Sequence, residues 1–212
     1  MAGQFDAFHS LEPEKKESIL NAALDEFSQK GFKKASTNAI VEQAGISKGM
    51  LFYYFGSKDE LFDFLCEYTI EFAKREYVEK FAHRSEIPDF IERCKALTEL
   101  KRHVFQNHPK IIQFYESFFL AGNAEYFSKY SDTIQELYGT VRGGLYENID
   151  YSLFREDIPP EQVLTYIKWL TERYEKELTD KIVAAGNVQG ENAFHDYYAF
   201  LADLKKVFYK SF

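Results

Sequence analysis

The stretch from Ser36 to Leu61, STNAIVEQAGISKGMLFYYFGSKDEL, decides the fold of this chain. Ser36 or Thr37 can begin a short helix, because a side-chain oxygen at this position accepts hydrogen bonds from free backbone N–H groups. Gly45 follows at the point where a helix ends and the backbone needs a left-handed residue. Ser47 can then begin a second helix. Two helices joined by so short a glycine-containing turn predict a helix-turn-helix, whose second helix suits the major groove of DNA.

The apolar residues of this stretch recur at helical spacing. Ser57 and Glu60 form a capping box, which predicts that a third helix starts directly after the second. We expect the inward side chains to be Ile40, Val41 and Ala44 in the first helix and Leu51, Phe52 and Phe55 in the second.

The other side of the second helix offers groups that bind DNA. Lysines and tyrosine hydroxyls bind phosphate oxygens, apolar side chains contact the thymine methyl group, and a glycine lets the backbone approach closely. The alternative is that the aromatic run at residues 52–55 only fills a small helical core. We expect the DNA contacts to come from Thr37, Ser47, Lys48, Gly49, Met50, Tyr53, Tyr54 and Lys58.

This segment closely resembles the DNA-binding domain of TetR-type transcriptional regulators. The resemblance begins at KKESILNAALDEFSQKGFKKAS (residues 15–36) and runs through AIVEQAGISKGMLFYYFGSKDELF (residues 39–62). Val41 stands where the family usually has alanine, and Phe52 stands where a tyrosine is common. The resemblance implies a homodimer with a ligand-responsive C-terminal domain. It also implies a repressor that a small molecule releases from a palindromic operator.

The helical period continues through the remainder of the chain, and the alternation typical of strands is nearly absent. We predict an all-α fold of about nine helices. Residues 1–62 would form an N-terminal arm and a three-helix helix-turn-helix domain, with the first ten residues as the arm. Residues 63–212 would form a helical ligand-binding and dimerisation domain. The expected later helices span about residues 58–82, 88–107, 109–119, 124–146, 161–185 and 193–209, with a loop at 148–157.

The last two helices carry apolar stripes that are wider than one core-facing side requires. The resemblance implies that these helices form a four-helix bundle with those of a second copy; packing within one chain is the alternative. The stripes are Val163, Leu164, Ile167, Leu170, Tyr174, Leu178 and Ile182, and Phe194, Tyr197, Tyr198, Leu201, Leu204 and Phe208.

The middle of the chain is rich in aromatic residues, which predict a cavity for an apolar or amphipathic small molecule. The alternative is an ordinary aromatic core. We expect the ligand contacts at His103, Tyr115, Phe119, Tyr138, Arg142, Trp169 and Arg173.

The charge of the chain is unevenly distributed. The whole chain of 212 residues has a net charge of −8, whereas residues 30–58 carry five lysines against one acid, a net charge of +4. An acidic body with a small basic face should bind generic DNA weakly, which favours a discriminating regulator. The acidic total also supports an alternative, a helical interaction protein that has lost DNA binding.

Other function classes lack their signatures. The sequence has no phosphate-binding glycine loop, no nucleophile turn and no histidine pair at metal-ligand spacing, so we expect no catalytic residue, metal site or cofactor. A membrane span and a secretory signal are also missing, which predicts a cytoplasmic protein. Cys66 and Cys94 lie in separate helical patterns and are expected to be buried free thiols rather than a redox switch.

Overall fold

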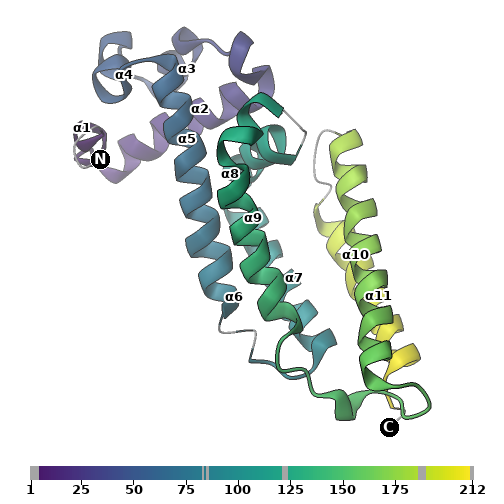
Figure 1. Ribbon diagram of the computed structural model, residues 1–212. Coiled ribbons are helices and arrows are strands. Elements are labelled where there is room, and N and C mark those ends of the chain that lie inside the picture. Colours follow the sequence, from purple (N-terminus) through teal and green to yellow (C-terminus); the bar gives the residue numbers. More distant parts are fainter. Residues whose placement is uncertain (1–4, 83, 85, 121–123, 186–189, 211–212) are drawn as a thin grey trace. The chain divides into compact units, whose positions relative to one another are not determined.

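The structure is a computed structural model that describes residues 5–82, 84, 86–120, 124–185 and 190–210. It is all-α, as predicted, and the described residues contain no β-strand; a single bridge joins Phe154 to Tyr209. Two compact units make up the chain (Figure 1). Unit 1 comprises Met1–Ala73 and His108–Tyr130, and unit 2 comprises Lys74–Asn107 and Ser131–Phe212. No described helix is both long and apolar enough to cross a membrane.

Unit 1 contains the helix-turn-helix and the helices that support it. Its core centres on Phe62, whose ring lies 5.1 Å from that of Phe27 and 4.8 Å from that of Phe118. The ring of Phe114 lies 5.7 Å from the same side chain. The elements are α1 (Asp6–His9), α2 (Pro13–Lys34), α3 (Thr37–Ala44), α4 (Lys48–Phe55), α5 (Lys58–Ala73), α8 (Pro109–Tyr115), the π-helix η2 (Glu116–Leu120) and the start of α9 (Ala124–Tyr146).

The N-terminal segment differs from the expected arm, because residues 6–9 form the short helix α1. Phe8 is buried, and its ring lies 5.0 Å from Phe55 of α4 and 5.3 Å from Phe64 of α5. Burial of this one aromatic side chain anchors the segment to α4 and α5, a contact that the predicted arm did not include.

Unit 2 begins within the long helix predicted at residues 58–82. That helix is α5 followed by a π-helical stretch, η1 (Lys74–Glu79), and by α6 (Lys80–Ala82). The predicted loop at 148–157 contains one 3-10 turn, η3 (Tyr151–Leu153), and the break predicted at Gly122-Asn123 lies outside the described residues. The other elements are α7 (Phe90–Asn107), the main part of α9, α10 (Pro160–Ala185) and α11 (Gly190–Phe208).

The core of unit 2 joins α7, α10 and α11. Phe90 and Cys94 of α7, Ile167 of α10 and Leu201 of α11 are all buried in one apolar cluster. Cys66 of unit 1 is buried as well, and both cysteines are free thiols whose pKa burial raises. The expectation of buried free thiols is confirmed.

One buried cation fastens the start of α7 to the end of α9. Arg93 is fully buried, and its guanidinium donates to the carbonyl oxygens of Ile87, Gly144 and Glu147, with Nε 2.7 Å from the oxygen of Ile87. The last carbonyls of a helix have no partner inside the helix. Arg93 supplies partners for those of α9, which is why a charged side chain is stable at this position.

Candidate nucleic-acid interface

The turn between α3 and α4 forms as the sequence predicts. Ser36 is the cap of α3, since its Oγ accepts a hydrogen bond from the backbone N–H of Ala39 at 3.4 Å. Gly45 ends α3 with φ 64° and ψ 36°, in the left-handed region. Ser47 caps α4 by accepting from Met50 N at 3.2 Å. Both ends of the turn are therefore fixed by local hydrogen bonds and one glycine.

The junction between α4 and α5 is fixed in the same way. Gly56 ends α4 with a positive φ of 73°, and a Cβ at this position would collide with the Glu60 carboxylate. Ser57 Oγ accepts from Glu60 N at 3.1 Å, as the predicted capping box requires. Helix α4 thus lies between two turns, each with a positive-φ glycine and a serine cap.

The buried side of α4 differs in one position from the prediction. Leu51 and Phe55 are buried as expected, but the third buried side chain is Tyr54, while Phe52 is only half-buried. The ring of Tyr54 lies 6.4 Å from that of Phe8, so α1 covers it. The expectation that Tyr54 points outward and Phe52 inward is wrong in this respect.

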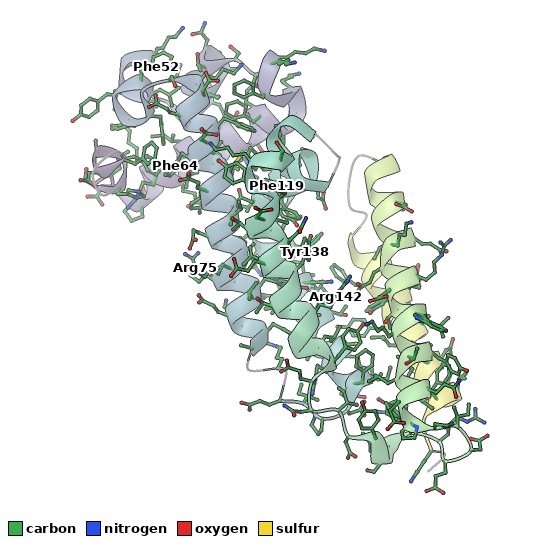
Figure 2. All side chains as sticks on the ribbon, in the orientation of Figure 1. Phe52, Phe64, Arg75, Phe119, Tyr138 and Arg142 are labelled. Carbon is green, nitrogen blue, oxygen red and sulfur yellow. The ribbon has the colours of Figure 1, made fainter. Side chains whose placement is uncertain are left out.

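The solvent side of α4 is open. Tyr53 is 75% exposed, and Ser47, Lys48 and Gly49 are exposed beside it. Met50 is half-buried. Most of the expected DNA-binding side chains of α4 therefore lie together on the solvent side, in the upper left of Figure 2, where Phe52 is labelled.

Neither the backbone conformation nor the packing of the described residues requires a glycine at position 49. Its φ is ordinary for a helix, and an added Cβ would meet only Ser47 Oγ, at an unstrained 3.9 Å. A glycine inside a helix costs about 0.5–1 kcal/mol relative to alanine. Nothing within the described chain offsets this cost, which is consistent with an external surface that approaches the backbone closely.

Two of the remaining candidates lie near the ends of the motif. Thr37, the first residue of α3, is half-buried and leaves the capping role to Ser36. The ammonium group of Lys58 lies 5.0 Å above the ring of Phe32 and 3.4 Å from the carbonyl oxygen of Lys33. Lys58 is the first residue of α5, and its ammonium group therefore lies beside the last turn of α2, at the protein surface.

The structure adds residues that the sequence did not single out. Asp25 of α2 accepts hydrogen bonds at Oδ2 from Gln43 of α3, at 3.2 Å, and from Lys110 of α8, at 2.5 Å. Ser18 donates to the carbonyl oxygen of Ala44 at 3.2 Å. These contacts attach the motif to the body of unit 1. They join residues up to 85 positions apart, so no local pattern could have indicated them.

The expected ligand-binding residues do not form one group. Tyr115 and Phe119 belong to unit 1, where their rings lie 5.5 Å apart. The others belong to unit 2, and the expectation that these point inward is wrong, because all are exposed in the single chain. They are His103, Tyr138, Arg142, Trp169 and Arg173. Tyr138 and Arg142 lie one turn apart on α9 (Figure 2).

The apolar stripes of α10 and α11 serve mainly the core of unit 2. Val163, Ile167 and Leu201 have no exposed surface, and Phe208 is buried as well. Ile182 lies outside the residues whose side chains are described. Three large apolar side chains of these helices remain exposed: Trp169 (61% exposed), Leu170 of the α10 stripe (42%) and Val207 (51%).

Known proteins share this arrangement. Residues 19–64 match the family described as bacterial regulatory proteins, tetR family. The regulator RutR of Escherichia coli K12 is 34% identical over 111 residues, which cover 51% of this chain and 49% of RutR. The regulator YvdT of Bacillus subtilis is 43% identical over 53 residues, 25% of this chain and 27% of that protein. The chain thus spans about half or less of the length of these curated relatives.

Solved structures agree in fold over most of the chain. A TetR-like regulator from Rhodococcus sp. RHA1 has a TM-score of 0.58 at 24% identity, covering 91% of this chain and 93% of its own. KstR2 of Mycobacterium tuberculosis, described as a ketosteroid transcriptional regulator, has a TM-score of 0.62 at 20% identity, covering 95% and 98%. At these identities the similarity establishes the all-α architecture and nothing more specific.

Proposed function

We propose that the chain is a DNA-binding transcriptional regulator of the TetR family that works as a homodimer; its match to the family over residues 19–64 and its similarity to RutR support this. The observation that carries the proposal is the solvent side of α4. There a 75% exposed tyrosine, an exposed lysine and a glycine without an internal role lie between two capped turns.

In this proposal α4 enters the major groove, and its side chains divide the work. Lys48, Tyr53 and Ser47 bind phosphate oxygens, Gly49 lets the backbone approach, and Met50 contacts a thymine methyl group. Thr37 and Lys58 bind phosphates beside the groove. Tyr54 is removed from the set that touches DNA directly, because its ring is buried beneath α1.

We place the dimer contact on the exposed apolar side chains of α10 and α11. Trp169, Leu170 and Val207 would be covered by the same helices of a second copy, in a two-fold interface. The proposal rests on their exposure, since large exposed apolar side chains on these two helices would be buried by a partner. Two copies would then present two α4 helices to half-sites spaced by about 34–36 Å, one turn of DNA, or a multiple of it.

The regulator is further proposed to be a repressor that a small molecule releases from its operator. The contacts that support a coupling are those of Asp25, which connects α8 to α2 and to α3. A ligand bound beside α8 and η2 would shift α8 and, through Asp25, the motif. Such a ligand lowers operator affinity only by the difference between its affinities for the two states, commonly about 5- to 150-fold.

Fluorescence anisotropy with labelled duplexes tests the proposal. The duplexes tile the DNA upstream of the protein's own gene, with shuffled duplexes of equal length as controls. A regulator binds one duplex at least about 1,000-fold more tightly than the shuffled ones. An acidic interaction protein that lost DNA binding, with its net charge of −8, binds none of them preferentially, and that result would refute the proposal.

A further inference from the structure

A buried carboxylate oxygen that has no hydrogen-bond partner among the described residues lies in unit 1. Glu116 is the first residue of η2, directly after α8, and its side chain is half-buried. Its Oε1 atom is inaccessible to solvent and has no hydrogen-bond partner among the described residues. Buried polar atoms nearly always have such a partner. A site that lacks one in the free protein can acquire it from a bound ligand.

The charges on neighbouring elements are engaged elsewhere. Asp25 of α2 is paired with Lys110 of α8, and Asp63 of α5 is paired with Lys129 of α9 at 2.7 Å. Only burial acts on Glu116, and it raises the pKa of this carboxyl group to about 7. Among the described residues, therefore, an acid lies in a poorly solvated position and no cation acts on it.

Aromatic side chains lie next to this acid in the chain. Glu116 directly follows Tyr115, whose ring lies 5.5 Å from that of Phe119, the fourth residue of η2. Phe119, labelled in Figure 2, is buried, and its ring lies 6.1 Å from that of Tyr130 in edge-to-face geometry. Aromatic ring faces attract cations, especially where water is excluded.

We propose that Glu116 is the anionic anchor of the effector site and that the effector is an organic cation with an apolar or aromatic body. This inference rests on the proposed function, since it assumes that unit 1 binds the effector of a regulator. An amidinium, guanidinium or ammonium group supplies the missing hydrogen-bond donor and neutralises the carboxylate. An anion is repelled, and a neutral donor such as an amide supplies a weaker hydrogen bond without neutralising the carboxylate.

The proposal predicts that cation binding depends on pH. Below pH 7 much of the free Glu116 is protonated, and a cation must displace that proton to bind. Affinity for the cation should therefore increase with pH up to about 7 and then level off. Binding below that pH should also release a proton, which calorimetry detects as a heat that depends on the buffer's ionisation enthalpy.

Three probes of nearly equal shape provide the test: benzamidinium, benzamide and benzoate, which carry a positive, a zero and a negative charge. The full-length protein is titrated with each in a calorimeter, without DNA. We expect benzamidinium to bind about tenfold or more tightly than the other two, in line with the strength of a charge-assisted hydrogen bond. Equal binding of benzamide, or no binding of benzamidinium, would overturn the proposal.

Two variants at the site and one control variant locate the binding of the cation. E116Q should lose the preference for benzamidinium and the proton release, while E71Q, which removes an exposed carboxylate from α5, should keep both. F119L retains an apolar side chain but removes the ring, and should weaken benzamidinium more than benzamide. Unchanged discrimination in E116Q with native circular dichroism would refute the assignment.

The proposed function is tested separately, because operator binding by the ligand-free protein does not involve Glu116. If the protein binds its operator but does not prefer the cation, the inference fails alone. If it prefers the cation but binds no operator, the assignment of the site stands while the regulatory function fails.

Discussion

Lys110, at the start of α8, forms an ion pair with Asp25, in the middle of α2, with 2.5 Å between Nζ and Oδ2. The Asp25 side chain is mostly buried, and the same oxygen accepts a hydrogen bond from Gln43 of α3. Three helices of unit 1 thus share one carboxylate oxygen, including one from the helix-turn-helix.

Lys110→Met should lower the free energy of unfolding by about 1 kcal/mol or slightly less, because one partner is only partly exposed. Lys206→Met is the matched control, since its pair with Asp203 is fully solvated and joins neighbours on one helix. Urea denaturation followed by circular dichroism measures both. An equal effect of the two substitutions would show that the α2–α8 pair has no special role.

Tyr53→Phe should weaken operator binding by about tenfold, because it removes a hydroxyl that donates to a charged phosphate. Tyr54→Phe removes the same atom from a buried ring of the same helix and should leave operator affinity nearly unchanged. Anisotropy titrations at a fixed salt concentration compare them. The assignment of α4 to the groove is wrong if the two variants are indistinguishable.

Gly49→Ala should separate stability from binding. The added methyl group meets no strained contact, so the variant should be more stable by about 0.5–1 kcal/mol, yet it should bind operator more weakly. Gly45→Ala makes the opposite comparison, because its φ of 64° disfavours any Cβ and should cost about 1 kcal/mol. Thermal unfolding measures the stability of both variants, and anisotropy measures their operator affinity. Operator binding by Gly49→Ala as tight as that of the unchanged protein would contradict the prediction.

Acid should destabilise unit 2 through Asp89. Burial alone would raise the pKa of this carboxyl group, but hydrogen bonds from Lys205, Tyr209 and the backbone of Glu92 outweigh it and lower the pKa below 3.8. A group with a depressed pKa contributes stability above its unfolded value and loses it as the pH falls through the folded value. Asp89→Asn should therefore flatten the loss of stability as the pH falls below about 4, the ordinary pKa of an aspartate. A slope equal to that of the unchanged protein contradicts this role.

Trp169→Glu should give folded monomers that no longer bind operator, because the exposed indole lies in the proposed dimer surface. Leu201→Glu should instead unfold unit 2, since this side chain has no exposed surface within one chain. Light scattering and circular dichroism distinguish the two results. A wild-type protein that is monomeric at micromolar concentration would exclude the proposed interface.

The sequence predicted the helix-turn-helix well because its signals are local. Ser36, Gly45 and Ser47 act through neighbouring backbone groups, and their capping roles appear in the structure. The buried face of α4 was less predictable, because it depends on Phe8, which lies far earlier in the chain. Tyr54 is buried near the Phe8 ring, whereas Phe52 is only half-buried. Leu201 illustrates the same limit, since periodicity does not show whether an apolar stripe meets its own chain or another.

The proposed small-molecule site was the least predictable part. Aromatic residues at helical spacing are equally compatible with a core and a cavity, and five of the seven candidates are exposed in unit 2. What distinguishes Glu116 is a missing partner, and this depends on every side chain that packs around it. The spacing of residues in the sequence therefore cannot predict that a buried carboxylate lacks a hydrogen-bond partner.

Arg93 has a consequence for how unit 2 opens. Helix ends ordinarily fray, but the end of α9 cannot loosen without removing the acceptors of a buried guanidinium. These acceptors at the end of α9 lie 51 to 54 residues from Arg93 along the chain. The last turn of α9 and the first turn of α7 should therefore open in a single event. Amide hydrogens in these two turns should then exchange with solvent at matching rates, as parts of one cooperative element.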